Sequence, residues 1–168
     1  MFAKLKQRWQ DMRTIADLSK DAERRALQAG QQHPGAEHYA LAALDLADGS
    51  ARRVFQRIGA DPEAYRAALA NRHVEALSAM GLDVVGAGEP PAPAAPGKLF
   101  DAQPSGQALM QTLPEVQRRL PAPLCGAHIL LAVAGMRLSA AGRALGAINV
   151  DPQALGRAAE EELRAMLA

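Results

Sequence analysis

Glu37 and His38 are the first neighbouring residues in the sequence whose side chains could do chemistry together. They stand at the start of the apolar run GAEHYALAALDLADGS, residues 35–50. A carboxylate beside an imidazole can transfer protons, ligate a metal ion or bind a cationic ligand. An acid in the first turn of a helix is also favoured by the helix dipole alone. The sequence around Glu37 is therefore consistent with two interpretations, a contact with a ligand and a purely helix-stabilising role.

The remaining histidines and the one cysteine do not assemble a metal site or a catalytic set. His33 and His38 are five positions apart across Pro34-Gly35, so they do not share a helix face. A metal site would need these two to converge with His73 or Cys125. Cys125 stands between Leu124 and Gly126 without an evident activating group, which favours a small packing residue over a nucleophile. We expect no catalytic residues, no metal and no cofactor.

Composition narrows the class of protein. The 168 residues are 49% apolar, 22% charged and only 4% aromatic, with a net charge of +1. A core built from Leu, Ala, Val, Ile and Met favours closely packed helices. The small net charge gives no pull toward nucleic acid or membranes. No stretch reaches the roughly 18 apolar residues of a membrane span, and the start lacks the apolar region of a secretory signal. We expect a cytoplasmic protein without stable membrane association.

Hydrophobic periodicity predicts helices throughout. A second helix fits 36–47, a third has Ser50 as its N-cap, and a fourth begins at Pro62 and runs to Met80-Gly81, with Asn71 as a candidate break. Residues 85–98 are rich in Pro, Gly and Ala and are typical of a linker. The first helix is predicted from an apolar residue at every third or fourth position, a single stripe of Leu5, Trp9, Met12, Ile15, Leu18, Ala22 and Ala26.

The second half of the chain repeats the first at an offset of 90 positions, without a gap from His38 to Ala68. One corner is encoded twice: Gly59 or Asn149 tolerates the left-handed conformation, and an Asp-Pro pair then favours a new helix start. The histidine of the E-H pair recurs in the second copy, whereas the glutamate does not. We therefore predict that this histidine forms a hydrogen bond with the backbone at the start of its helix. The matched structural positions are His38 with His128, Asp61 with Asp151, and Pro62 with Pro152.

The duplication predicts an all-α fold. Each four-helix unit alone would expose an apolar face, and packing the two units on one another buries both faces. We therefore expect two pseudo-twofold-related repeats forming one domain over 1–168. Its parts are repeat 1 at about 14–84, the linker at 85–98 and repeat 2 at about 99–168.

The repeated unit resembles the amino-terminal (Clp repeat) domain of the Clp unfoldases. That family reads roughly G-T-E-H-[LI]-L-L-x-L and then L-G-V-[DS], twice. The matching segments here are PGAEHYALAAL with VFQRIGADPEAYRAAL, and CGAHILLAVA with ALGAINVDPQALGRAA. The sequence has no G-x-x-x-x-G-K-[ST] phosphate loop, because Gly97-Lys98 is followed by Leu99. The resemblance therefore implies a free-standing, non-enzymatic recognition domain without the ATPase module.

The resemblance also implies partners and a site. In the family this domain docks adaptors and substrates, and in some members the Glu of each E-H pair binds phosphoarginine, a degradation mark. Glu37 matches that glutamate, Ala36 replaces the usual Thr beside it, and Ala127 replaces the second glutamate. The implied role is that of an adaptor, a decoy or a substrate-capture protein near a Clp unfoldase.

Other functions stay open. A groove between the repeats could hold a small apolar ligand, such as a natural product aimed at Clp machinery. The N-terminal helix combines Leu5, Trp9 and Met12 with basic residues. We expect one docked face and one solvated face there, with a membrane-surface or partner-binding helix as the alternative. A hydrolase and a DNA-binding protein have little support, because no catalytic set and no basic recognition helix are present.

Overall fold

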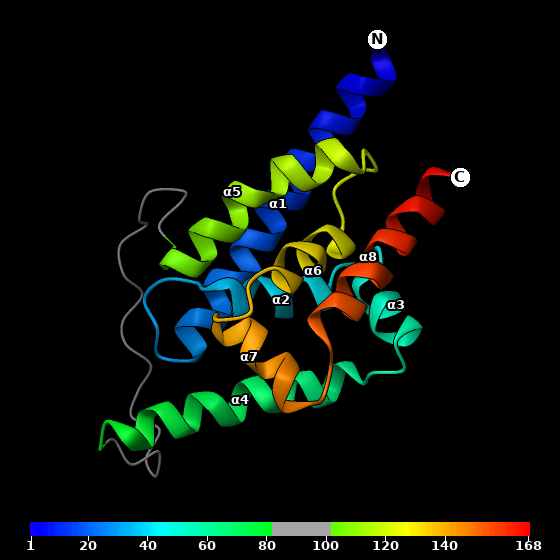
Figure 1. Ribbon diagram of the computed structural model, residues 1–168. Coiled ribbons are helices and arrows are strands. Elements are labelled where there is room, and N and C mark those ends of the chain that lie inside the picture. Colours follow the sequence, from blue (N-terminus) through cyan, green and yellow to red (C-terminus); the bar gives the residue numbers. More distant parts are fainter. Residues whose placement is uncertain (82–101) are drawn as a thin grey trace.

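The computed structural model describes residues 1–81 and 102–168, and helices are its only regular elements in these residues (Figure 1). The predicted all-α fold is thus confirmed for the described part of the chain. The predicted linker 85–98 lies outside the described residues. The helices are α1 (Phe2–Gln28), α2 (Ala36–Leu44), α3 (Ser50–Arg57), α4 (Pro62–Ala79), α5 (Pro104–Arg119), α6 (Gly126–Ala134), α7 (Ala140–Ala147) and α8 (Pro152–Leu167).

The duplication in the sequence is visible in the helix boundaries. α6, α7 and α8 begin 90 positions after α2, α3 and α4. At both corners the chain turns through a left-handed residue, Gly59 with φ +64° and Asn149 with φ +57°. The Asp61 carboxylate then accepts the Glu63 N–H at 2.9 Å, and Asp151 caps α8 in the same way. Local capping chemistry therefore sets both restarts.

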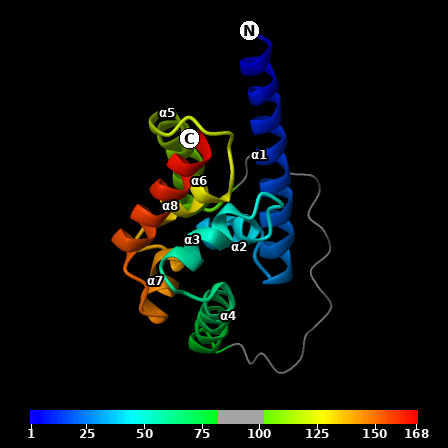
Figure 2. The ribbon, with the colours of Figure 1, turned by 90° about the vertical axis from the view of Figure 1, so that its right-hand side faces the viewer.

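The two halves share one apolar core, which contains buried side chains from all eight helices of the described residues and consists mainly of Leu, Ala and Val with a few larger residues. Helices of one half pack against helices of the other: α3 lies against α8, and α7 lies against α4 (Figures 1 and 2). Inside the core, the Tyr65 hydroxyl on α4 donates to the Ala141 carbonyl of α7 at 3.1 Å. Because α3–α8 and α7–α4 are equivalent pairs under the repeat, this packing accords with a pseudo-twofold arrangement.

One ion-pair cluster joins the halves beside this core. The Glu162 carboxylate of α8 is buried, and its two oxygens accept from Arg53 Nε at 2.5 Å and Arg57 Nε at 3.0 Å, both on α3. Burial alone would raise the pKa of Glu162, but the hydrogen bonds and charges of the two arginines outweigh burial and lower it. Glu162 is therefore charged at neutral pH and holds α8 on α3.

Four local predictions are corrected by the structure. The second helix ends at Leu44 rather than at 47, and α4 runs through Asn71 without a break. Ser50 is the first residue of α3 rather than its N-cap, because Gly49 takes the cap position with φ +66°. The predicted single stripe of α1 is wrong for its first part, where the side chains point to solvent instead of docking: Leu5, Trp9 and Met12.

Candidate functional site

Histidine organises the first turn of α2. The Gly35 N–H donates to His38 Nδ1 at 2.9 Å, and the Cys125 N–H donates to His128 Nδ1 at 3.3 Å in the second copy. Both imidazoles are buried. Burial lowers the pKa of both, although the Glu37 charge partly opposes the shift at His38. Each ring is therefore neutral at pH 7 and serves as the acceptor that starts its helix.

Glu37 is held at the same turn. Its side chain is 14% exposed, and it folds back over Gly35 so closely that a Cβ on Gly35 would collide with the carboxylate. The nearest basic atom is His38 Nδ1 at 3.7 Å, which is a neutral ring nitrogen. Among the described residues no lysine or arginine pairs with Glu37. The result is a largely covered carboxylate whose charge no side-chain cation of the described residues neutralises.

Ser105 on α5 binds the first turn of α2, although it lies 69 positions after Ala36 in the sequence. Its Oγ accepts the Ala36 N–H at 3.1 Å, so the hydroxyl hydrogen remains free to donate. The Ala36 side chain is fully buried and offers no surface of its own. No pattern in the sequence indicated Ser105, since nothing local links it to residue 36.

The loop before α2 is fixed by the start of α5. The backbone N–H of Gln103 donates to the Pro34 carbonyl at 3.0 Å, and the side-chain amide of Gln103 donates to the His33 carbonyl at 2.9 Å. Gly106 lies so close that a Cβ there would stand 2.5 Å from the Pro34 oxygen. The position of Glu37 therefore depends on contacts between the two repeats, and glycine is required at 106 for them to form.

The equivalent turn of α6 is closed. The Ala127 N–H donates to Ser50 Oγ at 2.9 Å, and the Gly126 N–H lies 3.4 Å from Asp48 Oδ2. Ala127, at the position of Glu37, is fully buried. Because the N–H groups already have partners and the side chain has no exposed surface, this turn cannot form a second copy of the Glu37 site.

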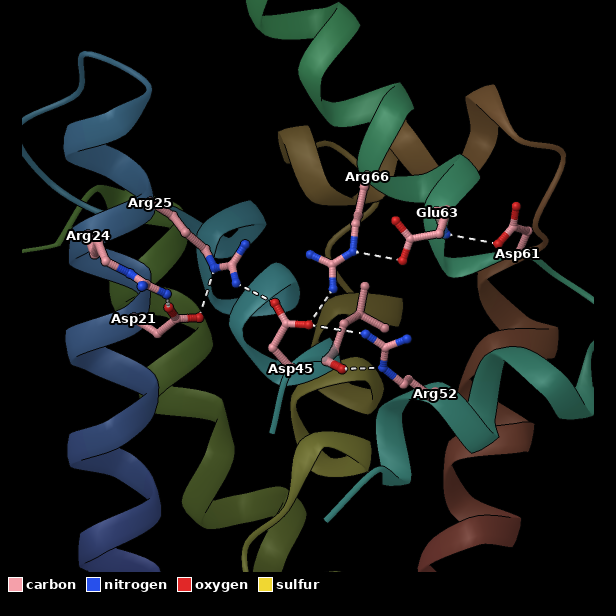
Figure 3. Close-up of polar contacts among 9 residues, drawn as sticks. Asp21, Arg24, Arg25, Asp45, Arg52, Asp61, Glu63 and Arg66 are labelled. Atoms are coloured by element: carbon pink, nitrogen blue, oxygen red, sulfur yellow. Dashed lines mark hydrogen bonds and ion pairs between the residues drawn. The ribbon is translucent and has the colours of Figure 1, made fainter. Parts of the chain in front are cut away.

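A charged cluster surrounds Asp45 at the other end of α2 (Figure 3). The carboxylate pairs with Arg25 of α1, with Arg52 of α3 at 3.1 Å, and with Arg66 of α4 at 2.6 Å. Burial would raise the pKa of Asp45, but the hydrogen bonds and charges of Arg66 and Arg25 lower it. One carboxylate thus ties four helices together, which no pattern in the sequence had indicated.

A pocket of about 330 Å³ opens beside this cluster, between α1 and the end of α2. Its charged groups are largely paired with one another, as Asp21 is with Arg24 and Arg25 (Figure 3). Paired arginines have little remaining affinity for an anion, so the cluster is interpreted as a structural clamp. The lining residues are Asp17, Leu18, Asp21, Arg24, Arg25, Ala42, Asp45, Leu46 and Ala47.

The other candidates for chemistry lie elsewhere. Cys125 is buried, and burial raises the pKa of its thiol, which favours packing over nucleophilic attack. Within residues 1–81 and 102–168, no three His, Cys, Asp or Glu side chains are grouped as ligands for a metal ion. No helix in the same residues is both long enough and apolar enough to cross a membrane.

Comparisons with known proteins identify one family. Residues 15–102 match the family described as the Clp repeat (R) N-terminal domain. This match covers half of the chain, including α2 with Glu37 and the Asp45 cluster. A search of curated proteins gave no match.

Proposed function

The chain belongs to the Clp repeat N-terminal domain family, and we propose that it is a non-enzymatic recognition module that presents arginine-phosphorylated proteins to Clp-type ATP-dependent proteolysis. The family itself indicates a role in protein interaction within Clp systems. The observation that carries the finer proposal is the Glu37 carboxylate, which is largely covered yet has no cationic partner among the described residues.

A guanidinium fits this carboxylate. Two carboxylate oxygens can accept a pair of parallel N–H donors, and such charge-assisted pairs are about twice as strong as neutral hydrogen bonds. His38 does not compete for Glu37, since its buried ring is neutral and its Nδ1 already accepts the Gly35 N–H. An incoming arginine would therefore supply the positive charge that the site lacks.

The phosphoryl group has fewer partners on the protein. The start of α2 favours an anion through the helix dipole, and the Ser105 hydroxyl has a hydrogen left to donate. Ala36 would contribute only through its backbone, whose N–H holds Ser105 in place. The guanidinium contact at Glu37 is thus expected to supply most of the affinity, and the phosphate contact most of the discrimination against plain arginine.

Isothermal titration with phosphoarginine tests the proposal. The wild type should bind one ligand per chain, because the α6 turn is closed by Ser50 and Asp48. E37Q should weaken binding by about tenfold to a hundredfold, the equivalent of one lost charged pair of hydrogen bonds. E63Q is the matched control, because Glu63 occupies the same second position of its own helix, α4.

Two results would end the proposal. One is the absence of heat from the wild type, and the other is equal affinity of the wild type and E37Q. Binding of two ligands per chain would instead show that the α6 turn was misjudged. Plain arginine and inorganic phosphate serve as competitors, and each alone should displace phosphoarginine only weakly.

The alternative of an apolar small molecule between the repeats has no comparable support. The pocket beside Asp45 lies within the first half of the chain, and charged residues form much of its wall. Its charged lining does not suit an apolar ligand, and its lining residues all come from the first repeat. The choice among adaptor, decoy and substrate-capture protein depends on whether the module contacts a Clp unfoldase, which a pulldown with that unfoldase would measure.

A further inference from the structure

The first three turns of α1 expose an apolar row. Phe2, Leu5, Trp9 and Met12 are 90%, 67%, 66% and 69% exposed. Figure 2 shows this end of α1 projecting beyond the other helices. The row lies before residues 15–102, the part of the chain that matches the family. We call these four residues the N-terminal seam.

The seam faces away from the body of the protein. On the opposite side of the same turns, Asp11 accepts the Leu124 N–H at 2.8 Å and a Gln117 N–H at 2.7 Å. With about 100° per residue, the seam lies roughly 140° around the helix from Asp11. Polar contacts through Asp11 thus fix this part of α1 on α5 and the loop after it, while the apolar residues remain available.

The shape of the seam suits another helix. Its residues are spaced three, four and three apart and fall within roughly 80° of the helix circumference, which is the narrow seam of a coiled coil. A helix that lies in a membrane surface usually has a wider apolar face. The spacing therefore favours a helical partner over a lipid surface.

The charges beside the seam define the chemistry of that partner. Lys6, Arg8 and Arg13 occupy the positions that flank the seam, and none of them takes part in an ion pair among the described residues. In a parallel pair of two such helices Arg8 would face Arg13, and in an antiparallel pair Lys6 would face Arg13. Both arrangements set like charges against each other, which disfavours a second copy of this chain.

We propose that the N-terminal seam docks an acidic amphipathic α-helix of a partner protein. The partner places leucine-type side chains on Phe2, Leu5, Trp9 and Met12, and places Glu or Asp beside Lys6, Arg8 and Arg13. This inference goes beyond the proposed function, because the surface is separate from Glu37 and does not depend on it.

The fluorescence of Trp9 tests the proposal directly, since Trp9 is the only tryptophan in the chain. The probe is a three-heptad helical peptide with Leu at the seam positions and Glu at the flanking positions. Its addition should shift the Trp9 emission to the blue in a saturable way, and raised salt should weaken the effect. A peptide with Lys in place of Glu should give no shift.

Variants separate the seam from the rest of the helix. K6E/R8E/R13E should weaken binding of the acidic peptide by roughly tenfold or more and should allow the Lys peptide to bind. L5S should weaken binding of the acidic peptide without changing the helix content by circular dichroism. K20E, on the same helix but outside the seam, and E37Q should bind the acidic peptide like the wild type.

Three results would overturn the proposal. The first is a Trp9 shift with phosphatidylserine vesicles but not with the acidic peptide. The second is a dimer in sedimentation that L5S abolishes. The third is equal binding of the acidic and Lys peptides by the wild type. Because E37Q is neutral in this assay, failure here would leave the phosphoarginine proposal unaffected.

Discussion

Glu162 offers the sharpest test of how the two halves are held together. Its side chain is 5% exposed, whereas those of Arg53 and Arg57 are 46% and 37% exposed. Within this cluster the carboxylate of Glu162 is thus buried, whereas the two arginine side chains are in contact with water. Removing the acid and removing the bases should therefore have different consequences.

E162Q should lower the free energy of unfolding by about 1–2 kcal/mol. The glutamine keeps the shape and one carbonyl acceptor, and the two arginines regain water, so little beyond the charged hydrogen bonds is lost. R53Q/R57Q should lower the free energy of unfolding further, by about 3 kcal/mol, because this double substitution leaves a buried carboxylate without a cation. With about 2–4 °C per kcal/mol for a chain of this size, the two variants should differ visibly in Tm.

Urea unfolding followed by circular dichroism at 222 nm measures both values at pH 7. E161Q is the matched control, since Glu161 is the exposed neighbour and its loss should cost less than about 0.5 kcal/mol. The reasoning is refuted if E162Q destabilises the protein as much as R53Q/R57Q does, because the acid would then not be the buried partner.

The same cluster predicts a pH dependence with a definite sign. The arginines lower the pKa of Glu162 in the folded protein below the ordinary value of 4.5. The unfolded chain therefore takes up its proton first, and the stabilisation is complete above pH 4.5 and disappears as pH falls below it. The wild type should lose more stability than E162Q between pH 6 and pH 3.5.

Further substitutions address the helix starts and the corner. S50A removes the acceptor of the buried Ala127 N–H, so it should cost about 1–3 kcal/mol in urea unfolding. N149G should leave Tm nearly unchanged, whereas N149V should cost about 1–2 kcal/mol, because residue 149 is left-handed. Burial lowers the pKa of His128, so its ring should stay neutral by NMR below pH 6.5, and the unfolding free energy should fall as pH drops below 6.5.

The parts of the fold that the sequence predicted are those fixed by neighbouring residues. Asp61-Pro62 and Asp151-Pro152 start helices because the cap and the first N–H groups lie within three positions of each other. Periodicity located all four helices of the first half, but it misplaced two boundaries, suggested a break inside α4 and misassigned the exposed part of α1. At Ser50 the prediction failed because the hydroxyl bonds α6, 77 positions away, while Gly49 takes the cap.

The stripe of α1 shows a different limit. Steps of three and four from Leu5 to Ala26 appear continuous in the sequence, yet they accumulate an angular drift. Leu18 and Ala22 face the core, whereas Leu5 and Trp9 lie on another side of the helix. Counting steps identified a helix correctly, but it did not show that the helix has two apolar faces.

The candidate site was predictable only in part. Glu37 was identified from its place beside His38 at a helix start, and the family resemblance implied its ligand. Its lack of a cation among the described residues was visible only in three dimensions. Ser105 and the Asp45 cluster join residues that are 20 or more positions apart, apart from the bond to Arg52. Such pairings follow from the packing of helices, which one sequence does not specify residue by residue.

The starts of α2 and α6 show how two copies of one unit come to differ in their surroundings. α2 and α6 share the histidine that accepts the backbone N–H, so the structural part of the motif is retained in both. The first turn of α2 contacts Ser105, and the Glu37 carboxylate there stays partly exposed. The first turn of α6 meets Ser50 and Asp48, which satisfy its amides and bury Ala127. Packing one repeat on the other therefore closes the start of α6, and it leaves at the start of α2 the carboxylate on which the phosphoarginine proposal rests.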